Sequence, residues 1–75
     1  MSNRILLHIE ISAILENHRN SWMTTRELAD LVNARGHYLK RDGTPVTAYQ
    51  VHGRTKNYVR IFERDGARVR LRLAP

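Results

Sequence analysis

The 75-residue chain contains no cysteine, which excludes disulfide bonds, thiolate metal sites and a cysteine nucleophile. It has no apolar run close to the roughly 18 residues that a membrane span needs, and no signal-peptide pattern. A chain of this length buries only roughly 60% of its unfolded surface on folding. We therefore expect residues 1–75 to form one soluble, cytoplasmic domain of marginal stability, with no membrane partner.

Sequence motifs for catalysis and ligand binding are also missing. The four histidines lack the spacing of a metal site, in which two histidines four residues apart stand near a carboxylate. The chain shows no glycine-rich phosphate loop, nucleophile elbow or paired-carboxylate motif. We therefore expect a protein that is not an enzyme and that uses no metal and no cofactor.

Acidic residues are scarce in the second part of the chain. Up to Arg35, four basic residues balance four acidic ones, whereas nine basic and three acidic residues follow, so the whole net charge of +6 lies after Arg35. This asymmetry is typical of a surface that binds a polyanion. Anionic lipid and an acidic protein are alternative partners, but the arginines do not line one amphipathic helix, which disfavours a membrane.

Residues 5–18 form a long and mostly apolar segment. Polar residues recur at every fourth position, at Arg4, His8, Ser12 and Glu16, which predicts a largely buried helix with a narrow polar strip. A strand also suits the β-branched residues, but the segment is long for one. So wide an apolar stripe needs more cover than a small domain supplies, and a second copy or a larger parent protein would provide it.

A second helix is predicted over residues 25–35. Thr24 and Glu27 form a capping-box pattern before it, and Gly36 stands where a left-handed C-cap belongs. Trp22 lies just before the cap in a short extended corner. We interpret its ring as a core-edge residue that bridges the first helix and the sheet, with base stacking as the alternative.

A third helix candidate runs from Thr47 to Tyr58, after a loop punctuated by Asp-Gly and Thr-Pro. Thr47 and Gln50 form another capping-box pattern. Helical spacing turns one set of residues inward, namely Ala48, Val51, Thr55 and Tyr58. It turns a second set outward, namely Tyr49, Gln50, Gly53, Arg54 and Asn57. A guanidinium, two amides and a small residue suit the reading of base edges, whereas an ordinary solvated helix face is the alternative.

The period of the sequence changes to two after the third helix. Asp65-Gly66 predicts a two-residue hairpin turn between strands over residues 59–64 and 67–73. This turn sets four opposed pairs, Arg64 with Ala67, Glu63 with Arg68, Phe62 with Val69, and Ile61 with Arg70.

The predicted hairpin has an apolar and a cationic face. Phe62, Val69 and Leu71 point to the core, and Glu63, Arg68, Arg70 and Arg72 point to solvent. In this register Arg70 and Arg72 have no acidic partner across the strand, which favours phosphate contact. Charges on an exposed sheet edge also serve solubility, which is the alternative.

The predicted order of elements is that of a winged helix-turn-helix, an α+β fold of three helices followed by a two-stranded β-hairpin wing, here with a short extra strand near Trp22. The segments 22–29, 38–46, 50–51 and 58–63 resemble the winged modules of the HARE-type family, which accompany bacterial restriction endonucleases and DNA-modification proteins. The resemblance covers nearly the whole chain. It implies a bacterial, nucleoid-associated accessory domain that positions a nuclease or senses modified DNA.

These patterns predict a non-catalytic module that binds double-stranded DNA with helix 47–58 in the major groove, as part of a restriction-modification or transcription-regulating protein. The expected base-reading residues are Tyr49, Gln50, Arg54 and Asn57. The expected contacts to the DNA backbone are Lys40, Arg41, Thr47, His52, Lys56, Arg68, Arg70 and Arg72. The alternative is a protein-interaction domain that docks through the helix over residues 5–18, either on a second copy or within a larger assembly.

Overall fold

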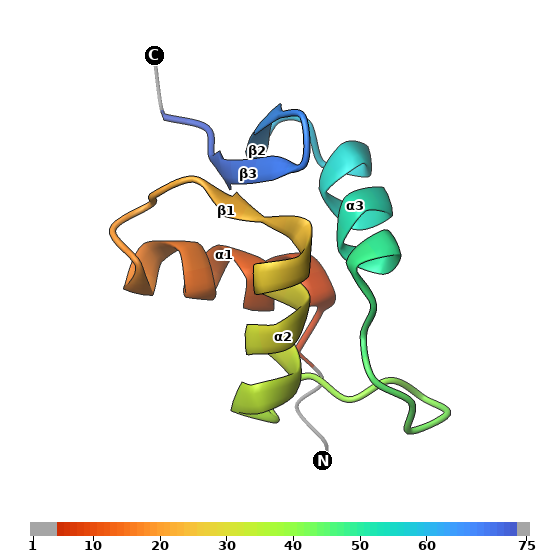
Figure 1. Ribbon diagram of the computed structural model, residues 1–75. Helices are drawn as coiled ribbons and strands as arrows, with labels where there is room; N and C mark the ends of the chain where they lie inside the picture. The colour runs from red at the N-terminus through yellow and green to blue at the C-terminus, as the bar shows by residue number, and fades with distance from the viewer. Residues whose placement is uncertain (1–4, 74–75) are drawn as a thin grey trace.

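The computed structural model describes residues 5–73, which form a small α+β domain (Figure 1). Its elements are α1 (Leu7–Asn17), β1 (Met23–Thr24), α2 (Thr25–Arg35), α3 (Ala48–Asn57), β2 (Phe62–Asp65) and β3 (Arg68–Leu71). The expected α+β class and the three helices are confirmed. The strand arrangement differs from a two-stranded hairpin, because β1 pairs with β3 and completes a three-stranded antiparallel sheet in the order β1-β3-β2.

Both predicted capping boxes are present. The Thr24 hydroxyl accepts the Glu27 N–H at 3.0 Å, and the Glu27 carboxylate accepts the Thr24 N–H at 2.8 Å. Thr47 and Gln50 exchange the same two bonds at the start of α3, at 3.2 and 2.9 Å. Gly36 ends α2 with a left-handed φ of 70°. These local bonds give α2 its predicted bounds, because they satisfy the backbone groups that a helix end leaves open.

The hairpin turn is Gly66-Ala67, and the predicted turn at Asp65-Gly66 is wrong. Gly66 has a φ of 62° and is the first of the two loop residues, which is typical of a type II′ turn. The four predicted pairs are therefore wrong by two residues. The observed pairs are Phe62 with Leu71, Glu63 with Arg70, Arg64 with Val69, and Asp65 with Arg68. Because a shift by an even number of residues keeps the faces of a strand, Phe62, Val69 and Leu71 still share one face.

The predicted polar strip of α1 is wrong at His8, which is buried and stacks on the Tyr58 ring with centroids 4.0 Å apart. Arg4, at the start of that strip, lies outside the described residues. In contrast, Leu6 is 55% exposed and Ile9 is 52% exposed, although both belong to the apolar stripe of the sequence. The stripe was too wide for one small core to cover.

Glu10, also on α1, is buried with 1% of its surface exposed. Its Oε2 lies 2.7 Å from the Nε of Arg35 at the end of α2 and 3.7 Å from the Nδ1 of His37. A carboxylate is tolerated at such a position when a hydrogen-bonded cation accompanies it. This pair ties α1 to the end of α2, where the loop toward α3 begins.

The core lies between the three helices and one face of the sheet. It consists of Leu7, Ile11, Ile14, Leu15, Met23, Leu28, Ala29, Val32, Val46, Val51, Phe62 and Val69. Val51 is the apolar contribution of α3, and Thr55, one turn further on, is fully buried beside it. The Thr55 hydroxyl donates to the Val51 carbonyl at 2.9 Å, so that its burial leaves no open donor. Burial of these two residues fixes which face of α3 points outward.

Candidate nucleic-acid interface

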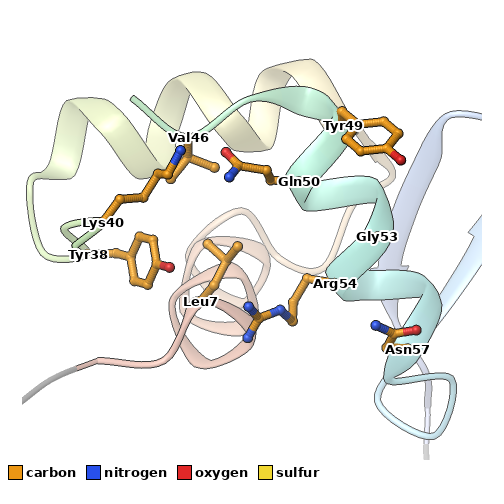
Figure 2. Close-up of a pocket in the computed structure, with 9 residues that line it drawn as sticks. All are labelled: Leu7, Tyr38, Lys40, Val46, Tyr49, Gln50, Gly53, Arg54 and Asn57. Carbon is orange, nitrogen blue, oxygen red and sulfur yellow. The ribbon is translucent and has the colours of Figure 1, made fainter. Parts of the chain in front are cut away.

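The outer face of α3 borders a shallow groove of about 210 Å³, which separates α3 from the start of α1 and from the loop between α2 and α3 (Figure 2). The groove is lined by Leu7, Tyr38, Lys40, Val46, Tyr49, Gln50, Gly53, Arg54 and Asn57. All four base-reading residues predicted from the sequence are therefore brought together, with Lys40 opposite them. Leu7 and Tyr38 were not expected at the site, because they reach it from other parts of the chain.

Two cations, Arg54 and Lys40, line the groove. Figure 2 shows Arg54 reaching from α3 toward Leu7 and Tyr38, while Lys40 and Gln50 lie further along, beside the loop. No acidic side chain is among the lining residues. The groove thus has a positive rim and a partly apolar floor, which suits a ligand that is anionic and has flat apolar surfaces.

Gln50 is only partly available to a ligand. Its side-chain oxygen accepts the Thr47 N–H at 2.9 Å and the Thr47 hydroxyl at 3.3 Å. The amide NH₂ remains for an outside acceptor. The Thr47 hydroxyl, predicted to contact a phosphate, accepts the Gln50 N–H in the same cap. The two residues therefore serve first to start the helix.

Tyr49 and Asn57 stand at the two ends of the outer face of α3. Tyr49 is 85% exposed, and its ring points away from the groove in Figure 2. Asn57 is exposed at the last turn of the helix. Gly53 lies one turn from each of them, so the middle of this face has no side chain. A partner that lies along α3 can hydrogen-bond at both ends and approach the backbone between them.

The loop that presents Lys40 has a defined shape. The Asn33 side chain donates to the Val46 carbonyl and accepts the Val46 N–H, both at 2.9 Å. Asp42 accepts the Thr44 N–H at 3.0 Å and the Thr44 hydroxyl at 2.7 Å. These bonds, together with the charge of Lys40, hold the pKa of the Asp42 carboxyl below its ordinary value. The loop is therefore held at both its turn and its end, beside the groove.

Arg41, predicted to touch a phosphate, is exposed on the turn of this loop, outside the set of residues that line the groove. His52, predicted to do the same from α3, faces the sheet. The Arg64 guanidinium of β2 lies 2.7 Å from the His52 Nδ1. Because a guanidinium only donates, this nitrogen accepts, and the neutral ring carries its proton on Nε2. His52 thus joins α3 to β2, and His52 and Arg64 define the sheet side of α3.

The prediction that Arg70 lacks an acidic partner is wrong, whereas Arg72 forms no ion pair within residues 5–73 and contacts backbone carbonyls instead. Arg70 forms an ion pair with Glu63, which lies opposite it in the observed register, and its guanidinium lies 4.5 Å from the centroid of the Trp22 ring. The Arg72 Nε donates to the Val59 carbonyl at 2.9 Å. The Nη2 of the same guanidinium donates to the Phe62 carbonyl at 3.3 Å. Both side chains therefore brace the hairpin. Glu63, which the predicted register places opposite Arg68, therefore pairs with Arg70 instead.

Three other cations are exposed, namely Lys56 in the last turn of α3, Arg60 after the end of that helix, and Arg68 at the start of β3. Within residues 5–73 none of the three forms an ion pair. Arg60 was missed by the sequence interpretation, which placed it in a strand, whereas β2 begins only at Phe62. A basic residue three positions after the last residue of α3 would have been the available signal.

Residues 5–73 contain no group of three or more histidine, cysteine, aspartate or glutamate side chains placed to hold a metal ion. In the same residues, no helix has the length and apolar character needed to cross a membrane.

Comparison with known proteins gives no relative from which a function could be carried over. No protein-family model matches the chain, and no curated protein and no solved structure matches it either.

Proposed function

We propose that the chain is a winged helix-turn-helix module that binds double-stranded DNA without catalysis, with α3 in the major groove. The observation that carries the proposal is the distribution of charge across α3, where neutral hydrogen-bonding groups occupy the centre of the outer face and cations occupy both sides. In the major groove, base edges likewise lie between two phosphate backbones.

Tyr49, Gly53 and Asn57 follow one another along the midline of the outer face, parallel to the helix axis. The amide NH₂ of Gln50 lies beside them. A phenol and amides are donors and acceptors that match base edges, and the amide of asparagine suits adenine in particular. Neutral groups along this line favour contact with bases over contact with phosphates, because a site that binds a phosphate needs cationic side chains.

The two sides of the face carry cations. On the groove side, Arg54 and Lys40 both line the groove, and no acidic side chain is among the lining residues. On the sheet side, marked by the contact between His52 and Arg64, the next turn of α3 carries Lys56. We assign Arg54 to the backbone contacts, because its side chain points sideways into the groove (Figure 2). Arg60, which follows α3, and Arg68, at the start of β3, are exposed and replace Arg70 and Arg72 in the proposal.

The order of elements supports the winged-helix assignment. The strand β1 follows α1, two packed helices follow β1, and the hairpin returns to pair with β1 through Met23 and Val69. Helix-turn-helix proteins place their second helix of the pair in the groove and position it with backbone contacts. The link to restriction-modification proteins rests on the sequence resemblance alone.

Binding to duplexes selected from a random-sequence library tests the proposal. Affinity for the selected duplex should exceed that for a scrambled one, and should fall steeply as KCl rises from about 50 to 200 mM. Lys56→Ala should lower the slope of log K against log salt by about one for both duplexes. Arg19→Asn is the matched control, because it also removes one positive charge. Arg19 lies in the turn after α1 and has a left-handed φ of 57°, which asparagine tolerates.

A protein-interaction module is the second candidate, favoured by the exposure of Leu6 and Ile9 at the start of α1. NMR titration with the selected duplex separates the two candidates. The DNA proposal requires chemical-shift changes at residues 49–57 and none at Leu6 and Ile9. If the duplex leaves α3 unperturbed, or if Lys56→Ala and Arg19→Asn bind alike, the DNA proposal is wrong.

A further inference from the structure

One glycine of the chain has no explanation within the fold. Gly36, Gly43 and Gly66 have φ values of 70°, 76° and 62°, in the left-handed region that other residues rarely adopt. Gly53 instead lies inside α3 and has an ordinary helical backbone. A Cβ atom built on Gly53 would meet no heavy atom of the described part of the chain within 4 Å. Neither backbone conformation nor packing therefore requires a glycine at this position.

The glycine carries a cost for the protein. In a helix interior, glycine is less favourable than alanine, because it loses more backbone freedom on folding. The helix has only ten residues, and no acidic side chain stabilises its first turn. The missing side chain at position 53 therefore weakens an element that is already short.

The position of Gly53 points to something outside the chain. It lines the groove, one turn after Tyr49 and one turn before Asn57, with Arg54 beside it (Figure 2). These larger side chains surround a notch in which the α3 backbone is the nearest surface. Since no side chain of residues 5–73 fills the notch, a partner group can lie against the backbone there.

We propose that the edge of a DNA base pair packs directly against the α3 backbone at Gly53, so closely that a methyl group would displace it. This inference rests on the proposed function and adds how deeply α3 enters the major groove of the DNA. A base edge suits the notch better than a phosphate, because its neighbours at both ends, Tyr49 and Asn57, are neutral. A base edge also suits the notch better than a partner helix does, because a glycine notch that receives a helix would be surrounded by apolar side chains.

The substitutions Gly53→Ala and Gly53→Leu test the inference by opposite effects on folding and binding. Because space is open and helix propensity rises, each should raise the melting temperature by several degrees. Each should also weaken binding to the selected duplex, by about tenfold for alanine and more for leucine, since a side chain now occupies the place of the base edge. Binding to the scrambled duplex should change less, because a loosely held duplex does not seat against the helix.

Asn17→Ala is the matched control. Asn17 is an exposed residue in the last turn of α1, so the substitution changes a helical position at a site away from the groove. It should leave both affinities unchanged, which separates helix stability from contact with DNA.

The possible failures are distinguishable. If the parent prefers the selected duplex and depends on Lys56, but Gly53→Ala and Gly53→Leu bind as tightly as the parent, only the close approach is wrong. A lower melting temperature for Gly53→Ala would also overturn it, because glycine would then serve the fold. If the parent shows neither sequence preference nor dependence on Lys56, the proposed function is wrong and the inference falls with it.

Discussion

Arg68 and Arg70 occupy the same face of β3 and have opposite roles in the structure. Arg70 is held by Glu63 and lies over the Trp22 ring, whereas Arg68 is exposed and forms no ion pair among residues 5–73. A cation that already has a partner gives up that interaction when it binds a phosphate. We therefore expect the two arginines to differ in DNA binding and in folding.

Replacing each arginine with alanine tests this difference. Arg68→Ala should lower the salt slope of DNA binding by about one and leave the free energy of unfolding nearly unchanged. Arg70→Ala should lower the free energy of unfolding by about 1 kcal/mol, through the lost contact with Trp22 and the ion pair, and change the slope by less. Urea unfolding and titrations at several KCl concentrations measure both. Equal salt slopes for the two variants would contradict the assignment.

Sequence patterns predicted which side chains face outward on α3, but not which of them are already engaged. His52 was grouped with the phosphate contacts, yet it accepts from Arg64 of β2, twelve residues away in sequence. The partner of Arg70 depends on the hairpin register, and that of Glu10 on how α1 crosses α2. Such partners are set by tertiary contacts, which no local pattern contains.

At the scale of the element, the capping box of α2 couples helix formation to a titrating group. The Glu27 carboxylate accepts the Thr24 N–H, and bonds to the backbone and side chain of Thr24 lower the pKa of Glu27 from its ordinary value of 4.5. Because the folded pKa is the lower one, this contribution to stability is present above pH 4.5. It is lost as the pH falls through the pKa of folded Glu27.

The substitution Thr24→Ala should lower the melting temperature at neutral pH by several degrees, because the Glu27 N–H loses its acceptor. The difference from the parent should shrink when the pH falls below the pKa of folded Glu27. That pKa should move up toward its ordinary value in the variant. Calorimetry at several pH values and NMR titration of the Glu27 side chain measure these effects. Thr24→Ser retains the hydroxyl and should behave as the parent; a gap that is independent of pH would contradict the coupling.

The elements were predictable where short-range chemistry decides them. Thr24 and Gly36 mark the two ends of α2 because a cap involves only residues within four positions. The hairpin was predicted, but its register was not. A glycine can occupy either loop position, and Gly66 takes the first one. The addition of β1 to the sheet depends on contacts across 46 residues, from Met23 to Val69, which local patterns do not reveal.

At the scale of the whole molecule, the distribution of charge was predictable and its use was not. The net charge of +6 arises after Arg35, as a count of the sequence shows. The fold engages Arg64, Arg70 and Arg72 in contacts with other parts of the chain. The total charge therefore overstates the number of phosphate contacts that the proposed function can use.

The same charge predicts that salt acts in opposite directions on folding and on DNA binding. Within residues 5–73, few acidic groups offset the cations, and the contact between Arg35 and the buried Glu10 is screened less than exposed charges. Mutual repulsion of the excess positive charge should therefore destabilise the folded chain at low ionic strength. Raising KCl from about 50 to 200 mM should raise the melting temperature while the affinity for DNA falls. Thermal unfolding and fluorescence anisotropy in the same buffers measure the two trends. If the melting temperature falls together with the affinity, unfolding would instead account for the loss of binding.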